Sequence, residues 1–429
     1  PNREHCWEAG EMKVLAFEQN PYRHLPDDFE SRYDSVVVTP YLDLVDARRV
    51  HEDYTACVNE MLAATDLGFD GLVVTEHGQN SYDMSPNPTL PATVVAHQMA
   101  ASGRDVALGV VGRPLGKTRE PLRIAEEYAV LDCISGGRLV AGFPVGLSYD
   151  ANLNAGVPPV ETRGRYYENH DLIKKAWSAT EPFAWNGTFT QYRHVNPWPR
   201  PIQQPSPPVW VPTTGSPGTM AWVLDNDYVY TYLSWFGRGT GVGVFQQFYD
   251  LAERKGHPAN PYRVAFLQVA AVGETDAEAE RDYAPHLEYF FRKCIGAIPP
   301  EGLGLPGYVD LAGLQHLMRD PSSLGNYPRL REITAADLIR EGSAIVGSPA
   351  TVRDQLVELV REFRIGSLLI MFQFGSLPHD LALHSMRLFA EKVLPDLRGV
   401  WEDEGWTHDW WPRGLPAAAP AAPDRRVTA

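Results

Sequence analysis

The chain has 429 residues, of which 44% are hydrophobic and 21% are charged, a composition typical of a globular protein with a large apolar core. Its 38 basic and 54 acidic residues give a formal net charge of −16, which argues against nucleic acids and anionic membranes as partners. The length allows about three domains of roughly 150 residues each, although barrels often exceed that size as single domains.

Short apolar runs alternate with helical patterns through the first half of the chain. Residues 12–17 form the first predicted strand, and residues 51–67 place apolar side chains on one helical face until Gly68 ends the helix. The same criteria predict strands at 71–78, 106–111 and 138–143, and helices at 91–102, 120–134 and about 161–177.

The alternation continues through the second half. The predicted strands there are 209–212, 227–233, 262–273 and 367–372, and the predicted helices are 242–255, 276–293, 349–363 and 379–394. Strands that are apolar at nearly every position, separated by helices, indicate a parallel sheet covered by helices. Eight such units favour a closed (β/α)8 TIM barrel over an open doubly wound sheet, and no GxGxxG turn follows the first strand.

Residues 12–400 are therefore predicted to form a single α/β barrel domain with long insertions at its C-terminal face. Residues 1–11 are expected to be an N-terminal extension or a tag remnant. Residues 401–429 are expected to be a Pro- and Ala-rich tail that is disordered or loosely docked. The insertion at about 294–343 is long enough for a lid over the active site.

Several classes of protein lack their sequence signatures here. The four cysteines, at positions 6, 57, 133 and 294, include no CxxC pair, which argues against a disulfide framework or a zinc site. No signal-peptide pattern opens the chain, and no uncharged run approaches the ~20 apolar residues that span a bilayer. HExxH, P-loop and GxSxG motifs are absent from the sequence. We therefore expect a cytoplasmic protein with no bound metal and no membrane or nucleic-acid partner.

Two titratable residues, Glu76 and His77, follow directly after the second predicted strand. Active sites of TIM barrels lie at the C-terminal ends of the strands, so this position favours a functional role. An imidazole can act there as an acid, a base or a hydrogen-bond donor near neutral pH. Position alone leaves a structural role open, with His77 hydrogen-bonded in the polar layer and Glu76 paired with an arginine.

The segment TTGSPGT, residues 213–219, joins the strand at 209–212 to a helix that starts near Pro217 or Gly218. Backbone N–H groups at such a helix start, together with the hydroxyls of Ser216 and Thr219, can hold a phosphate. Simple N-capping is the commoner role for this composition, and taken alone the segment favours capping.

In the predicted helix at 120–134, the i,i+4 spacing of Arg123 and Glu127 predicts a surface salt bridge.

Four groups of segments resemble the bacterial luciferase-like, flavin-dependent monooxygenase family. They are LGFDGLVVTEHGQN; REPLRIAEEYAVLDCISGGRLVAGFPVG; RYYENHDLIKKAW with the later PWPRPIQQPSPPVWVPTTGS; and GSPATVRDQLVEL with SMRLFAEKVLP. They occur in the family's order across most of residues 12–397. The family includes luciferase, alkanesulfonate monooxygenases and deazaflavin-dependent reductases. The resemblance implies a (β/α)8 barrel that binds FMN at its C-terminal end, usually as a homodimer or homotetramer.

The resemblance also implies roles for individual residues. Glu76 and His77 match the family's Glu-His pair at the end of the second strand, where the histidine belongs to the active site. Val111 and Gly112 match a stretch that packs beneath the flavin ring, often through a non-prolyl cis peptide. Glu126 matches an acidic residue in the helix before the fourth strand. These residues are the expected catalytic pair and one part of the cofactor site.

The other part of the expected cofactor site is the loop that binds the FMN phosphate, which Gly215, Ser216 and Thr219 match. The resemblance therefore reverses the preference for simple capping there. Luciferase-type members carry a phosphate-binding arginine where this chain has Val145, so another cation must replace it. The candidates are Arg113, Arg163 and Arg238.

Two further positions depart from the family pattern. Pro144 stands where luciferase has its reactive cysteine. Gly78 stands where a second histidine often follows the Glu-His pair. The chemistry expected of this chain therefore depends on His77 and on the flavin.

The combined prediction is a two-component flavin-dependent monooxygenase that takes reduced FMN from a separate flavin reductase. Reduced flavin reacts with O2 to give a C4a-(hydro)peroxyflavin, which would oxygenate a small organic substrate in a site that excludes water. His77 would position or protonate the reacting group. One alternative is a deazaflavin-dependent oxidoreductase that transfers hydride without O2. The other is a non-catalytic flavin-binding homologue, against which the retained Glu76 and His77 argue.

Overall fold

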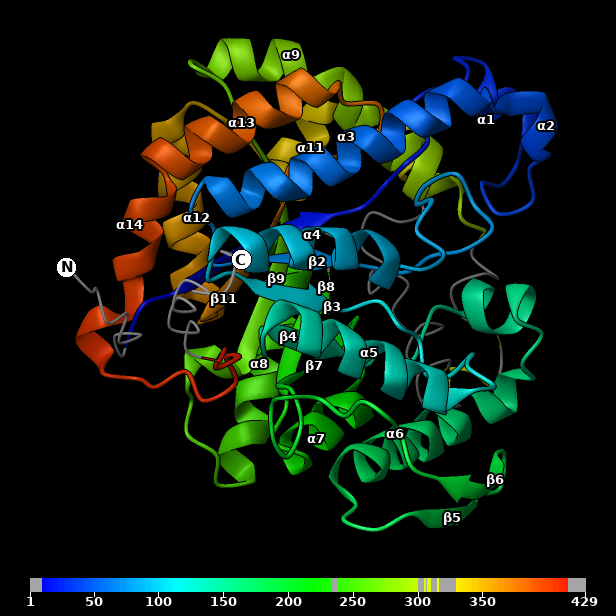
Figure 1. The fold of residues 1–429 in the computed structure, drawn as a ribbon. Coiled ribbons are helices and arrows are strands. Elements are labelled where there is room, and N and C mark those ends of the chain that lie inside the picture. The colour runs from blue at the N-terminus through cyan, green and yellow to red at the C-terminus, as the bar shows by residue number, and fades with distance from the viewer. Residues whose placement is uncertain are drawn as a thin grey trace, which may run out of the picture.

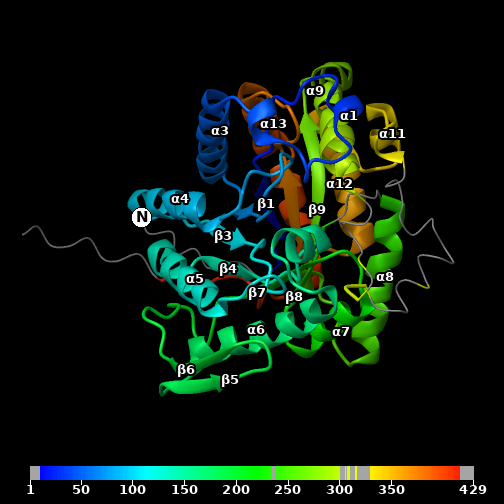
Figure 2. The ribbon, with the colours of Figure 1, turned by 90° about the vertical axis from the view of Figure 1, so that its right-hand side faces the viewer.

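The computed structural model describes residues 10–233, 238–299, 305, 307–309, 315 and 329–415. Eight parallel strands form a closed barrel with helices around it (Figures 1 and 2). In order around the barrel they are β1 (Lys13–Glu18), β2 (Gly71–Val74), β3 (Ala107–Val110), β4 (Leu139–Gly142), β7 (Val209–Thr213), β8 (Val229–Leu233), β9 (Val264–Val272) and β11 (Ser367–Met371). β11 returns to β1 with Lys13 opposite Ser367, which closes the barrel. The predicted (β/α)8 fold is confirmed.

The helices that surround the barrel lie close to the predicted ranges. They are α3 (Ala47–Asp66), α4 (Thr89–Ser102), α5 (Pro121–Ser135), α6 (Thr162–Ser178), α7 (Pro217–Asp225), α8 (Arg238–Arg254), α9 (Asp276–Tyr289), α12 (Pro349–Phe363) and α13 (His379–Lys392). Local signals fix the ends of α12: Pro349 occupies its first turn, the Ser348 hydroxyl accepts from the Thr351 amide, and Arg364 ends it with φ 51°.

Several elements were not predicted. β5 (Phe183–Asn186) and β6 (Gln191–Val195) form an antiparallel hairpin beside α6, and β10 (Ala344–Gly347) pairs with the last four residues of β9. Short helices add α1 (Phe29–Arg32), α2 (Tyr41–Leu44), α11 (Ala335–Arg340) and α14 (Leu394–Arg398). Much of the insertion at 294–343 lies outside the described residues, so the lid stays a prediction. No helix among the described residues has the length and apolarity needed to cross a membrane.

The barrel strands alternate between two apolar cores. Leu15, Phe17, Val73, Val140 and Trp210 belong to a cluster that includes the inside of the barrel. Their neighbours on the same strands belong to the larger cluster between strands and helices. Both faces of each strand are therefore buried, which explains why the strands read as continuous apolar runs.

The start of the C-terminal segment packs against the N-terminal end of the barrel. Trp401, Trp410 and Trp411 are buried. The Trp210 indole N–H donates to the carbonyl of Trp410 at 3.4 Å, and the Trp410 indole N–H donates to the carbonyl of Asp227 at 3.0 Å. Residues 401–415, where a loose tail is expected, thus include buried tryptophans at the closed end of the barrel. Residues 416–429, and residues 1–9 at the other terminus, lie outside the described part.

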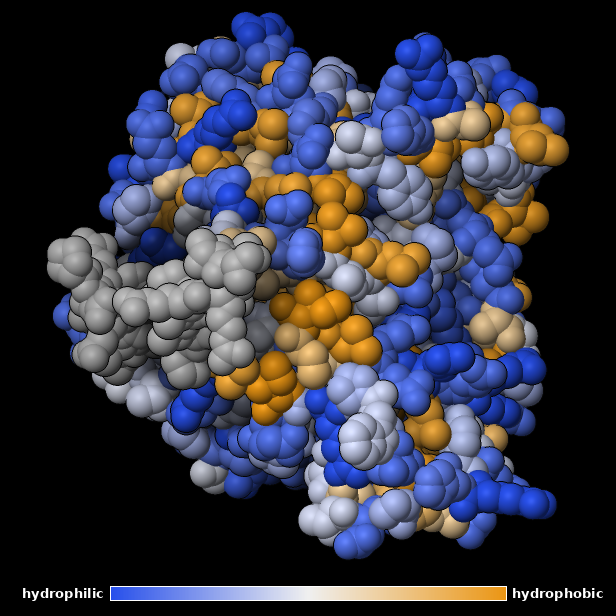
Figure 3. All heavy atoms as spheres, in the orientation of Figure 1, coloured by the Kyte–Doolittle hydropathy of each residue, from blue (hydrophilic) through white to orange (hydrophobic). Residues whose placement is uncertain are grey.

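Apolar side chains gather on the outer surface over α4 and α5 (Figure 3). The sequence of α4, TLPATVVAHQMAAS, contains no Asp, Glu, Lys or Arg, and Leu90 and Val94 of this helix are exposed. On α5, Val130 is also exposed. A helix without a charged face is unusual on a solvated surface.

Candidate functional site

Glu76 lies buried at the end of β2, between two cations. Its carboxylate oxygens lie 2.7 Å from Nη1 of Arg113 and 2.5 Å from Nζ of Lys117. Nη2 of Arg113 donates to Glu127 at 2.7 Å. Burial lowers the pKa of the Arg113 guanidinium, but Glu76 and Glu127 raise it more, so its net pKa is raised. Of the two roles left open for Glu76, the structure shows the pairing with an arginine.

These residues border a crevice of about 480 Å³ at the C-terminal end of the barrel. Its charged lining contains four cations and four carboxylates, namely Arg113, Lys117, Arg119, Arg123, Glu76, Glu120, Glu127 and Asp150. The balanced charges indicate an ion-pair network that holds the loops after β2 and β3 together, rather than a site for a large anion.

The helix α5 directs Glu127, and not Glu126, toward this network. Glu126 is 41% exposed in its side chain and lies 3.7 Å from Arg123 at i,i+3 spacing. The expected Arg123–Glu127 pair does not form, because Glu127 bonds to Arg113 instead. The structure therefore does not bring Glu126 to the crevice, and the residue beside it in sequence lies there.

His77 is held by two residues of a π-helical segment, η1 (Tyr149–Asn154), in the connection after β4. Its Nδ1 lies 2.9 Å from Oδ2 of Asp150 and 2.8 Å from the hydroxyl of Tyr149. The Tyr149 hydroxyl in turn hydrogen-bonds the hydroxyl of Tyr82. An ionised carboxylate only accepts, so Nδ1 carries a hydrogen and donates to Asp150. The other ring nitrogen, Nε2, has no hydrogen-bond partner among the described residues, and the side chain is 16% exposed.

The electrostatics favour a protonated His77. Burial lowers the pKa of His77, but the charge and hydrogen bond of Asp150 raise it more, so its net pKa lies above the usual value. Burial also raises the pKa of the nearby Asp83 carboxyl to about 6, against the opposing effect of His77. A protonated imidazole held through Nδ1 can donate a proton or a hydrogen bond from Nε2.

Sequence reasoning missed Asp150 and Tyr149. Both lie in the long connection between β4 and α6, which contains no regular pattern that marks a buried acid. The one available signal is their position shortly after a barrel strand, where polar residues have a functional prior.

Val111 and Gly112 lie where the ends of β2, β3 and β4 approach one another. A Cβ atom at Gly112 would lie 2.0 Å from the amide nitrogen of Glu76, and one at Gly142 would lie 2.1 Å from Cα of Val111. Only glycine allows such close contact between backbones. The cis peptide bonds of the described residues precede Pro199 and Pro205, so the expected non-prolyl cis peptide at Val111 is not present.

The loop between β7 and α7 leaves its polar groups open. Gly215 has φ 107°, and Ser216 occupies the N-cap position of α7 without a hydrogen bond from its side chain to the helix. A Cβ atom at Gly218 would meet nothing within 4 Å, whereas Thr219 is buried. The Ser216 hydroxyl therefore does not cap the helix, and it makes no hydrogen bond with the first N–H groups of α7.

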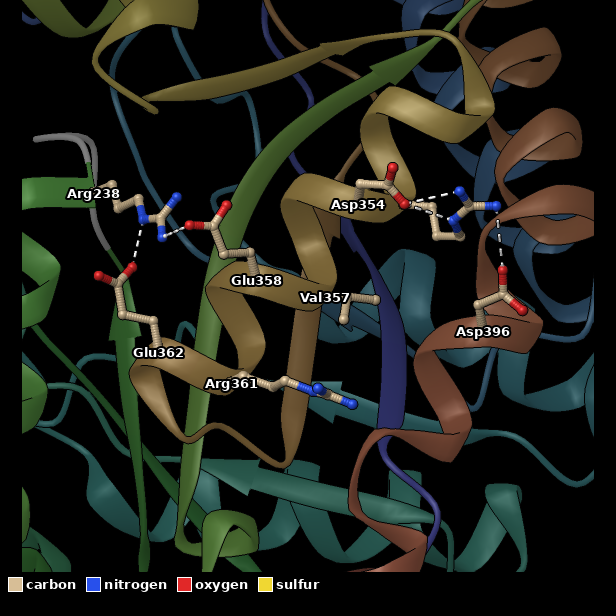
Figure 4. A pocket seen from close by; sticks show the side chains of 8 residues that line it. Arg238, Asp354, Val357, Glu358, Arg361, Glu362 and Asp396 are labelled. Atoms are coloured by element: carbon tan, nitrogen blue, oxygen red, sulfur yellow. Dashed lines mark hydrogen bonds and ion pairs between the residues drawn. The ribbon is translucent and has the colours of Figure 1, made fainter.

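The three candidate arginines differ in their partners. Arg113 is held by two carboxylates, as described above. Arg238 bonds Glu358 at 2.8 Å and also Glu362, in a groove on the outside of α12 (Figure 4). Nε of Arg163 donates to the carbonyl of Tyr308 at 3.4 Å, and no carboxylate pairs with Arg163 in the described part of the chain.

Arg163 also lies on the face of α6 that packs against α7. Tyr166 and Tyr167, one turn further along α6, have ring centroids 5.3 and 5.8 Å from that of Trp222 on α7. Both helices follow neighbouring parallel strands, so their first turns lie at the same end of the barrel. Arg163 thus lies in the first turn of α6, three and four residues before the tyrosines that contact α7, and Val145 lies in the connection that leads into α6.

Residues 38–365 match the family model described as luciferase-like monooxygenase. The chain belongs to the luciferase-like monooxygenase family. It is 25% identical to the protein y4wF of Sinorhizobium fredii over 76% of this chain and 87% of that one. It is also 31% identical to the oxygenase component of the flavin-dependent trigonelline monooxygenase of Acinetobacter baylyi, over 34% of this chain and 39% of that one.

Solved structures share the fold at low identity. The oxygenating constituent of 3,6-diketocamphane monooxygenase from Pseudomonas putida, in complex with FMN, has a TM-score of 0.66 at 17% identity, over 90% of this chain and 98% of that one. An F420-dependent secondary alcohol dehydrogenase has a TM-score of 0.60 at 14% identity, over 90% and 99%.

The Asp150→Asn substitution tests whether the negative charge of Asp150 raises the pKa of His77. A raised pKa contributes stability that is complete below the ordinary value of about 6.5 and is lost as the pH rises through the raised value. We expect the substitution to lower the pKa of His77 in NMR titration. It should also cost about 1–3 kcal/mol of unfolding free energy at pH 6, and less at pH 9. Titration of His77 at or below pH 6.5 in the wild type would contradict this account.

Proposed function

We propose that this chain is the oxygenase of a cytoplasmic two-component system. Reduced FMN from a separate flavin reductase, together with O2, would serve to oxygenate a small organic substrate. The observation that carries the proposal is His77 in a barrel of the luciferase-like family: Asp150 holds its Nδ1, and its Nε2 has no partner in the described part of the chain. Two similar proteins support it by name, one an oxygenase component and one solved with FMN.

The residues present fit a flavin phosphate at the start of α7. The hydroxyl of Ser216 is not used as a cap, and Gly218 is open to solvent. A phosphate placed there would accept from the first N–H groups of the helix and interact favourably with its dipole. Arg163 would supply the positive charge that other members take from the position of Val145, because no carboxylate pairs with its guanidinium among the described residues.

The chemistry of oxygen activation belongs to the flavin when it is bound. The residues of this chain would orient the ring and handle a proton. Val111 would lie beneath the ring, and His77 would donate from Nε2 to an oxygen of the reacting group. Asp150 would keep the imidazole oriented and protonated, and the ion pairs of Glu76 would hold the strand end on which His77 lies.

The central proposal is tested by mixing photoreduced FMN and protein with O2 in a stopped-flow spectrometer. We expect the wild type to slow the return of oxidised flavin and to lower the release of H2O2 relative to free FMN. His77→Gln should release H2O2 faster, by about tenfold or more, because it removes the proton donor. Identical reoxidation with and without the wild-type protein would contradict oxygenase function.

The hydride-transfer alternative is tested by competition between FMN and coenzyme F420 for binding to the protein. Tighter binding of F420 would favour hydride transfer.

The role of Arg163 is tested by comparing FMN with riboflavin, which lacks the phosphate. Arg163→Met should weaken FMN binding about 10- to 100-fold and leave riboflavin binding unchanged, because charge-assisted hydrogen bonds contribute about 1.5–3 kcal/mol. Arg238→Met is the matched control, since its pairs lie on the outer groove. Equal effects of the two substitutions would contradict the assignment.

We also propose that the apolar face of α4 and α5 joins two copies of the chain. The exposed Leu90, Val94 and Val130 support this, because an uncharged helix is stable on a surface chiefly when a partner covers it. Light scattering should show a homodimer or homotetramer for the wild type and a smaller species for Val94→Glu. Val242→Glu, on the surface of α8, should not change the assembly. A monomeric wild type would contradict the proposal.

A further inference from the structure

Two buried glutamines follow the ends of adjacent barrel strands at the mouth of the barrel. Phe17 of β1 pairs with Met371 of β11, and Gln19 and Gln373 each follow two residues later on neighbouring strands. β1 ends at Glu18 and β11 at Met371, and extending the alternation of each strand to the glutamines directs both toward the inside of the barrel, as for Phe17 and Met371. They are 2% and 1% exposed.

Three of the four polar side-chain atoms of this pair lack a hydrogen-bond partner among the described residues. Oε1 of Gln19 and both polar atoms of the Gln373 amide have no partner among the described residues. A buried amide normally finds partners, since an unpaired one has lost its hydrogen bonds to water without replacement. Gln268 shows the ordinary case: it is equally buried, and its Nε2 donates to the carbonyls of Val269 and Ser343 at 3.1 and 3.2 Å.

The pair lies at the level where a ligand enters a barrel of this type. β1 and β2 pair Phe17 with Val73, so Gln19 and Thr75 occupy the same level on adjacent strands. The amide of Val111 donates to the carbonyl of Val74, which continues that level onto the end of β3. The glutamines therefore lie at the level of the strand ends, where a ring bound at the C-terminal face would present an edge.

We propose that Gln19 and Gln373 bind the edge of a flat ring that carries an N–H group beside a carbonyl, as in a cyclic imide or lactam. A carboxamide presents one acceptor and two donors in one plane, and two of them side by side match alternating donors and acceptors on such an edge. Two sources offer this chemistry, the pyrimidine edge of a flavin and the ring of a heterocyclic substrate. The flavin source rests on the proposed function.

The variants Gln19→Met and Gln373→Met keep the size of each side chain and remove its amide. Gln268→Met is the matched control. Because the wild-type pair lacks partners in the free protein, we expect the first two variants to melt at the same temperature as the wild type or higher. Gln268→Met should melt lower, since it loses hydrogen bonds within the protein.

The flavin source is tested by the ratio of dissociation constants for FMN and for FMN methylated at N3, which lacks the ring N–H. The wild type should prefer FMN about tenfold, and Gln373→Met should reduce that preference to about one. Gln268→Met should keep it.

The substrate source is tested with uracil added to the protein saturated with FMN. The other outcome is that the variants leave the ratio of dissociation constants for FMN and N3-methylated FMN unchanged. In that case, uracil should raise the melting temperature of the wild type and not that of Gln19→Met or Gln373→Met. If the variants change neither the FMN ratio nor the effect of uracil, the two amide groups bind only water and the proposal is wrong. Failure of the wild type to bind FMN would contradict the proposed function instead, and uracil with the free protein would still decide the role of the glutamines.

Discussion

The contact between the backbones of β2, β3 and β4 at their C-terminal ends is the constraint on which the mouth of this barrel depends. Glycines at positions 112 and 142 let these strand ends approach to distances that no other residue allows. This approach fixes the direction in which the chain leaves β2. Glu76 then lies against Arg113 and Lys117, and His77 lies against the connection after β4. The positions of an acid and an imidazole thus follow from packing between main chains.

Several charged groups buried at this end of the barrel have a partner of opposite charge. Glu76 has two cations and His77 has a carboxylate, while Arg23 bonds the buried Glu60 at 3.2 Å. Removing one partner of such a pair leaves an uncompensated charge, which is why these networks hold loops in place. Nε2 of His77, Oε1 of Gln19 and both polar atoms of the Gln373 amide have no partner in the described chain. Buried polar groups without a hydrogen-bond partner in the protein are the ones expected to bind a ligand.

The sequence predicts all eight barrel strands because both faces of each strand are buried, which produces continuous apolar runs. It also predicts the positions of Glu76 and His77 at a strand end. It does not predict which face of α5 points toward the crevice. Glu126 and Glu127 differ by one residue, which is about 100° of rotation around the helix. Asp150 lies in a connection without regular periodicity, 73 residues from His77. Long-range contacts of this kind are set by the barrel and leave no local pattern.

The half-buried hairpin of β5 and β6 and the buried Trp410 escape prediction for a related reason. Trp410 contacts the N-terminal ends of β7 and β8, which are far from it in sequence, and the hairpin packs against α6 with few buried side chains, so local composition predicts a tail or a loop. The Pro-rich passages around both elements reinforce that reading.

A crystal structure of the chain with FMN would show where the phosphate and the ring bind. We expect the phosphate within hydrogen-bond distance of Ser216 and Arg163, and the ring over Val111 with Nε2 of His77 beside it. Flavin bound in the crevice of Arg113 and Lys117, or on the outer groove of Arg238, would contradict this expectation.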